Sequence, residues 1–203
     1  MNRYDYSPIY YPYAFRQAPA LVWTPAAVEL NQNLRALWEQ HVFWTRLTIN
    51  SIIDRLPDEA ETTKRLLRNA DDFGAALQPL YGPAIASRFA ELLRAHLTIA
   101  AELVKALQAG NTEAAADANK RWFANADEIA IFLSHINPYW SKAEWQTMMN
   151  EHLKLLTQEV SSRLAKNYAE NVALGDSIQA QALDMADVMT RGILQQFPSA
   201  FMH

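Results

Sequence analysis

The sequence predicts an all-α protein, a six-helix bundle built from three repeated helical hairpins. Three observations support this fold class. Apolar residues recur at helical spacing from Pro25 to Pro198, no segment alternates in the way a β-strand does, and the chain resembles itself at an offset of about 56 residues. A length of 203 residues suits one domain, expected over 25–203 and preceded by a segment of different composition over 1–24.

The segment 1–24 is rich in tyrosine and proline. It holds five of the eight tyrosines of the chain, interleaved with Pro8, Pro12 and Pro19. Proline favours extended backbone, and exposed aromatic rings usually find a surface to lie on. We therefore expect an extended arm that packs on its own domain, on a second copy of the chain or on a protein partner.

Caps and breakers divide the first half of the domain into three helices. Thr24 is an N-cap residue before a proline and starts a helix over 25–56. Asp58, with a glutamate three residues later, has the pattern of a capping box for a helix over 59–78. A segment with two prolines and a glycine separates it from a third helix over 84–109.

Three further helices are expected in the second half. They cover 112–135, a stretch that begins at the N-cap Ser141, and 171–197. The turn between the last two has two candidate positions. Equal spacing within the hairpins places it at 167–168, whereas the glycine at 175 marks a competing turn at 175–177.

An internal repeat is the strongest signal in the sequence. Residues 64–71 and 120–127 are identical at five of eight positions. Offsets of 55 and 56 residues also align His41, His96 and His152. Three copies of one helical hairpin are therefore expected, and both a pseudo-threefold ring and a row of stacked hairpins are compatible with the pattern.

Each hairpin contributes one histidine and one carboxylate that are equally far from the turn, so the two should lie at the same height. The pairs are His41 with Asp72, His96 with Glu128, and His152 with Asp184. An amide side chain precedes each acid by about one helical turn and shares its face: Asn69, Asn125 and Gln181. A polar layer inside the bundle is expected.

Two interpretations of this layer stay open. In the first, the three histidines converge and bind zinc, iron or manganese, with the three acids as direct ligands or as groups that orient the imidazoles. In the second, each histidine is satisfied by its own acid, and the layer is an internal hydrogen-bond network of a non-catalytic structural or interaction protein. Neither interpretation names a reaction or a catalytic residue.

Composition and charge exclude several classes of protein. A net charge of −4 without a basic cluster argues against nucleic-acid binding, and the absence of cysteine excludes thiolate metal sites and disulfides. No apolar run is long enough to span a bilayer, and the five glycines form no phosphate-binding loop. A cytoplasmic protein without a membrane span is expected.

Several segments resemble a family of helical proteins from spore-forming Firmicutes; they cover residues 39–46, 66–69, 120–127, 136–140 and 182–189. The resemblance implies a bacterial, spore-associated setting, which the tyrosine-rich arm suits by analogy, and it implies no activity. Such sequences sometimes carry the label acetylglutamate kinase. That fold is α/β with glycine-rich phosphate loops, and this chain has neither feature, so the label is rejected.

Overall fold

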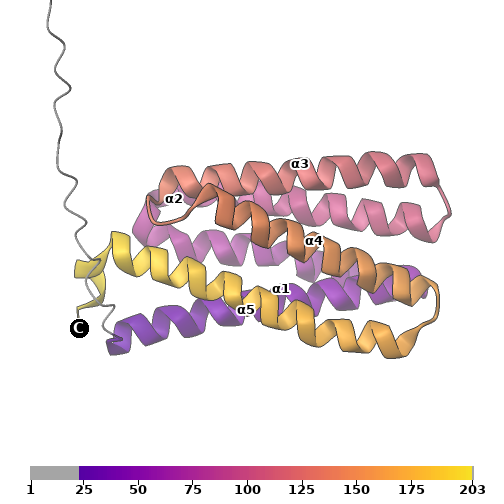
Figure 1. The fold of residues 1–203 in the computed structure, drawn as a ribbon, viewed down its shortest axis with the longest axis horizontal. Coiled ribbons are helices and arrows are strands. Elements are labelled where there is room, and N and C mark those ends of the chain that lie inside the picture. Colours follow the sequence, from indigo (N-terminus) through magenta and orange to yellow (C-terminus); the bar gives the residue numbers. More distant parts are fainter. Residues whose placement is uncertain (1–22, 203) are drawn as a thin grey trace, which may run out of the picture.

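The computed structural model describes residues 23–202, and over these residues the chain is helical without any strand. The all-α prediction is confirmed. The elements are α1 (Pro25–Ile53), α2 (Glu59–Gln108), α3 (Thr112–Ile136), α4 (Lys142–Leu164), α5 (Tyr168–Gln196) and the short 3-10 helix η1 (Pro198–Phe201). The helices run along the length of an elongated bundle (Figure 1). The predicted arm over 1–24 falls almost entirely outside the described residues.

Five α-helices are present in the described part of the chain, so the predicted number of six is wrong. The two helices expected on either side of residues 79–83 are both parts of α2. They meet at Gly82, which has φ 78° and ψ 167°, and there the chain folds back on itself (Figure 1). Only glycine adopts this conformation readily. The two arms of α2 pack closely enough that a Cβ on Gly74 would lie 3.2 Å from the Cβ of Ala90.

The three tight turns of the bundle lie at one end, and the fold-back of α2 and the α3–α4 connection lie at the other (Figure 1). The turns join α1 to α2, α2 to α3, and α4 to α5. Each contains one residue with positive φ: Arg55, Gly110 and Lys166. The third turn falls at 165–167 and not at 175–177, so α5 begins at Tyr168, earlier than the expected residue 171.

Side-chain caps fix most of the helix starts. The hydroxyl of Thr24 accepts a hydrogen bond from the backbone N–H of Ala27 at 3.2 Å, and Asn111, Ser141 and Asn167 cap α3, α4 and α5 in the same way. The capping box predicted at Asp58 is absent. Its carboxylate accepts from the hydroxyl of Ser51 at 2.8 Å instead, which ties the first turn to the end of α1.

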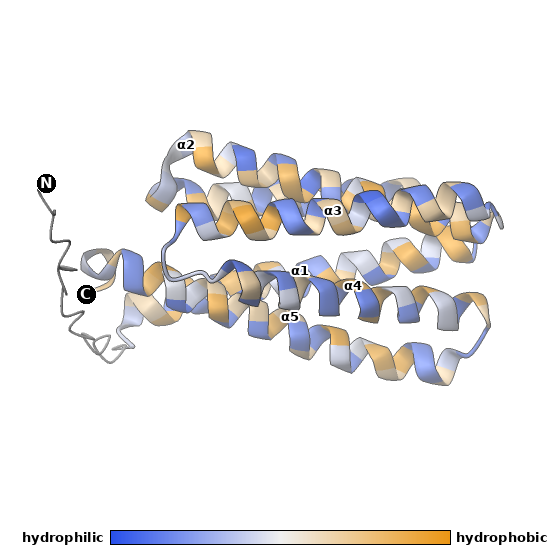
Figure 2. Ribbon diagram, turned by 45° about the horizontal axis from the view of Figure 1, so that its top comes forward, coloured by the Kyte–Doolittle hydropathy of each residue, from blue (hydrophilic) through white to orange (hydrophobic). Residues whose placement is uncertain are grey.

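The bundle buries one continuous apolar core along its length. Hydrophilic residues alternate with apolar ones around each helix, so that every helix has a polar outer face (Figure 2). Among residues 23–202, no helix combines the length and the apolar character needed to cross a membrane. The site described next is a polar layer within this core.

Candidate metal centre

Three histidines from three helices lie close together inside the bundle. His41 of α1, His96 of α2 and His152 of α4 are 2%, 3% and 1% exposed. The ring centres of His41 and His152 are 5.7 Å apart, and each of the three rings lies near enough to affect the ionisation of another. The three histidines that were expected to lie together thus line one small hollow inside the bundle.

Each imidazole is held by an amide side chain from the second helix of its own hairpin. Nδ1 of His41 lies 3.2 Å from the amide oxygen of Asn69, and the corresponding distances are 2.8 Å for His96 with Asn125 and 2.8 Å for His152 with Gln181. Each amide nitrogen in turn donates to the backbone carbonyl four residues before the histidine. The acceptors are Leu37 at 3.1 Å, Leu92 at 3.2 Å and Met148 at 2.9 Å.

This chain of two hydrogen bonds fixes the tautomer of each histidine. Because the amide N–H is directed at a backbone carbonyl, the amide oxygen faces the ring and can only accept. Nδ1 must therefore carry the hydrogen, and Nε2 is left with a lone pair. The Nε2 of His152 is buried and has no hydrogen-bond partner. An unprotonated Nε2 with its orientation set through Nδ1 is what a metal-binding histidine requires.

Burial keeps the three imidazoles neutral. Burial, together with the proximity of His152 and His96, lowers the pKa of His41 to about 3, against the hydrogen bond to Asn69. Burial likewise lowers the pKa of His96 to about 3 and that of His152 to about 4. The lone pairs are thus available at neutral pH without the loss of a proton.

The three acids expected beside the histidines lie elsewhere. Asp72 forms ion pairs with Arg65 and Arg68, at 3.6 and 3.5 Å, and Glu128 and Asp184 are exposed. Each acid follows an amide by three residues, and the amide occupies the position facing the ring. A carboxylate is also far better solvated at the surface than in this core. The expected pairing of histidine with acid is therefore replaced by a pairing of histidine with amide.

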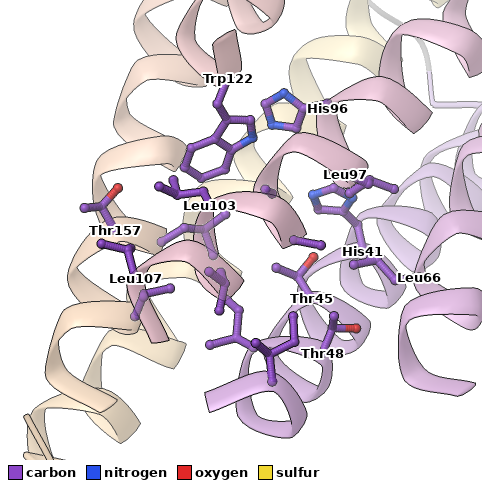
Figure 3. A pocket seen from close by; sticks show the side chains of 17 residues that line it. His41, Thr45, Thr48, Leu66, His96, Leu97, Leu103, Leu107, Trp122 and Thr157 are labelled. Atoms are coloured by element: carbon purple, nitrogen blue, oxygen red, sulfur yellow. The ribbon is translucent and has the colours of Figure 1, made fainter. Parts of the chain in front are cut away.

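Aromatic and aliphatic side chains surround the layer. The indole of Trp38 lies 5.5 Å from the His41 ring, and that of Trp122 lies 5.4 Å from the His96 ring, centre to centre. A small hollow lined by Phe89, Trp145 and other apolar residues adjoins all three histidines on one side. A second cavity adjoins His41 and His96 on the side of the hairpin turns (Figure 3).

As the side chains stand, the part of the chain over 23–202 contains no group of three or more His, Asp or Glu residues placed to hold a metal ion. The three rings would have to draw closer together around an ion.

Comparisons with protein-family models, with curated proteins and with solved structures found no match to this chain. The resemblance to helical proteins of Firmicutes and the spore-associated setting that it implies remain predictions.

A second polar cluster, between α1, α4 and α5, was not foreseen from the sequence. The guanidinium of Arg46 donates to the buried carboxylate of Glu159 at 2.8 Å and to the backbone and side-chain oxygens of Asn171 at 3.0 and 3.2 Å. Burial raises the pKa of Glu159 to about 7, against the effect of Arg46 and Arg163. The available signals were an acid on an apolar helix face and a glycine, Gly175, inside a helix.

Proposed function

We propose that this protein is a transition-metal-binding helical bundle in which His41, His96 and His152 bind one ion of zinc, iron or manganese through Nε2. The observation that supports the proposal is the pair of hydrogen bonds that links each imidazole to an amide side chain and that amide to a backbone carbonyl, which recurs in all three hairpins. Histidines that bind metals almost always donate their other ring N–H to a fixed acceptor, which sets the tautomer and the ring orientation.

The distance between the rings of His41 and His152 supports a shared ion. Two imidazoles bound to one ion at about 2.0–2.1 Å have ring centres roughly 5–5.5 Å apart. The centres of His41 and His152 are 5.7 Å apart, so a movement of about half an ångström would bring them to that distance. The three acids are not part of the proposed ligand set, because the amides Asn69, Asn125 and Gln181 take the orienting role.

The recurring hydrogen bonds also support a triplicated architecture. Asn69, Asn125 and Gln181 are spaced by 56 residues, and each donates to a carbonyl at the same position relative to its histidine. We propose that the three hairpins are copies of one unit that surround a common axis, with one ligand from each copy.

A second function is favoured by a different observation. Every Nδ1 and every amide in the layer is satisfied within the protein, and among residues 23–202 no group of His, Asp or Glu side chains is already placed to hold an ion. In this alternative the layer is an internal hydrogen-bond network, and the protein is a non-catalytic structural or interaction protein.

Elemental analysis distinguishes the two functions. The full chain is purified without an affinity tag, together with a His96→Ala variant and a His135→Ala control, in which an exposed histidine outside the layer is removed. Metal binding predicts one ion per chain, lost in His96→Ala and retained in His135→Ala. Protein that stays metal-free after incubation with zinc, iron and manganese leaves only the hydrogen-bond network.

A further inference from the structure

The cavity on the turn side of the histidines is small and largely apolar. It measures about 30 Å³ and is bounded by α1, α2, α3 and α4. The rings of His41 and His96 and the indole of Trp122 lie at one end, and Thr45 and Thr48 follow along α1 (Figure 3). Leucine, isoleucine, valine and alanine side chains make up most of the remaining wall.

Two threonine hydroxyls on this wall lack hydrogen-bond partners. Thr45 and Thr48 are 5% and 2% exposed, and neither hydroxyl is bonded. This is unusual for threonine in a helix, whose hydroxyl commonly donates to the carbonyl four residues earlier. Four other helical threonines in the chain do so at 2.8–2.9 Å: Thr98, Thr147, Thr157 and Thr190.

Thr45 is placed to contact a molecule bound in the cavity beside the histidines. It follows His41 by four residues, so it lies on the same face of α1 and roughly 6 Å further along the helix axis. The residues at the matching positions of the other two hairpins are Ala100 and Leu156, which offer no donor. The cavity thus has the imidazoles of His41 and His96 at one end, the unbonded hydroxyls of Thr45 and Thr48 along α1, and mostly apolar side chains elsewhere.

We propose that this cavity binds a neutral diatomic gas of the dioxygen class, held between the metal ion and the hydroxyl of Thr45. This inference rests on the proposed metal site with iron(II) or manganese(II) as the ion, and it concerns reversible binding in which the bond of the diatomic molecule is not broken. A cavity needs about 10–15 Å³ to hold one water molecule, so 30 Å³ accommodates a diatomic molecule and excludes an organic substrate. Apolar walls disfavour an ion, whereas a diatomic gas loses little hydration on entry.

The cavity itself is tested on the metal-free full chain with xenon, an apolar atom of similar size. Xenon-129 NMR should show saturable binding that is lost in Ala100→Leu and in Ala101→Leu, two substitutions that fill the cavity. Ala106→Leu, which changes an alanine of the same helix outside the cavity wall, should leave binding intact. A cavity that holds only ordered water would show no saturable xenon binding, and this result would overturn the proposal.

The ligand is tested on the iron(II)-loaded full chain with nitric oxide as the probe. Electron paramagnetic resonance should detect an iron–nitrosyl complex that is absent in Ala100→Leu. Thr45→Val keeps the side-chain size and removes one hydrogen bond, so nitric oxide should bind roughly fivefold more weakly. Thr98→Val, which removes an exposed hydroxyl from α2, should bind nitric oxide as the unmodified chain does.

The outcomes separate this proposal from the metal site. Iron that binds without forming a nitrosyl, or a nitrosyl unaffected by Thr45→Val and Ala100→Leu, overturns the gas site and leaves the metal site standing. A chain that binds no metal at all overturns both.

Discussion

Replacing Asn125 with leucine should destabilise the protein by leaving His96 without its acceptor. Asn125 accepts from Nδ1 of His96 at 2.8 Å and donates to the carbonyl of Leu92 at 3.2 Å, and both bonds are buried. A buried donor without a partner costs about 1–3 kcal/mol. For a chain of this size a loss of 1 kcal/mol lowers the Tm by about 2–4 °C. Asn125→Leu should therefore lower the Tm by roughly 2–12 °C.

The double variant His96→Leu with Asn125→Leu makes the test specific. Each single substitution leaves a buried polar partner unsatisfied, whereas the double substitution removes both groups. Its loss of stability should be smaller than the sum of the two single losses by about 1–2 kcal/mol. Urea denaturation in the presence of a metal chelator measures the cycle without any contribution from an ion.

Additive losses within about 0.3–0.5 kcal/mol would refute the role assigned to the amide, because they would mean that the two side chains do not interact. Metal affinity provides a second readout on the same variant. Loss of a group that orients a metal-binding histidine typically weakens binding about 10- to 100-fold, so Asn125→Leu should retain measurable but weaker affinity.

Three further results are expected. The metal-free protein should lose stability as the pH falls below about 6.5, because folding lowers the pKa of all three core histidines. The unfolded chain then takes up protons that the buried imidazoles do not, which favours unfolding. Urea titrations from about pH 7 to about pH 4 measure the free energy of unfolding, and a value independent of pH would contradict the prediction. Arg46→Met should cost about 1–3 kcal/mol, because Glu159, whose pKa is about 7, then takes up a proton and stays buried without the hydrogen bond from Arg46, and adding Glu159→Met should recover part of the loss in the same urea assay. Gly82→Ala should cost about 1–3 kcal/mol because φ is 78° at the fold-back of α2, and a thermal melt unchanged from that of the native chain would argue against strain there.

The helical elements could be predicted from the sequence because helix caps and apolar periodicity are local signals. Thr24 and Ser141 cap helices where expected, and Asn111 caps the helix whose start at residue 112 was expected. The third turn was ambiguous because it carries Lys166, not glycine, at its left-handed position, so the usual marker of a turn is missing. The two prolines around Gly82 predicted separate helices, and the structure has two helical arms that fold back on each other at Gly82, counted together as α2 because Gly82 is the one non-helical residue between them.

The sequence predicted which histidines lie in the candidate site, but it assigned the wrong hydrogen-bond partners to them. Equal distance from the turns placed each histidine level with an acid, and the amide one helical turn earlier was expected on the same face, so the spacing did not identify the amide as the partner. Side chains three residues apart on a helix point in directions that differ by about 60° around its axis. This difference is enough for Glu128 to face solvent while Asn125 faces the ring of His96. The choice depends on the orientation of each helix about its axis, which follows from packing of the whole bundle.

The fold-back at Gly82 divides the proposed ligands between two stretches of chain. His41 lies before it, and His96 and His152 lie after it. If the backbone were cleaved at this corner, neither piece would retain all three imidazoles, and an ion bound by all three would bridge the pieces. Reassembly of the two fragments would then depend on metal concentration, much as two subunits depend on a shared ligand.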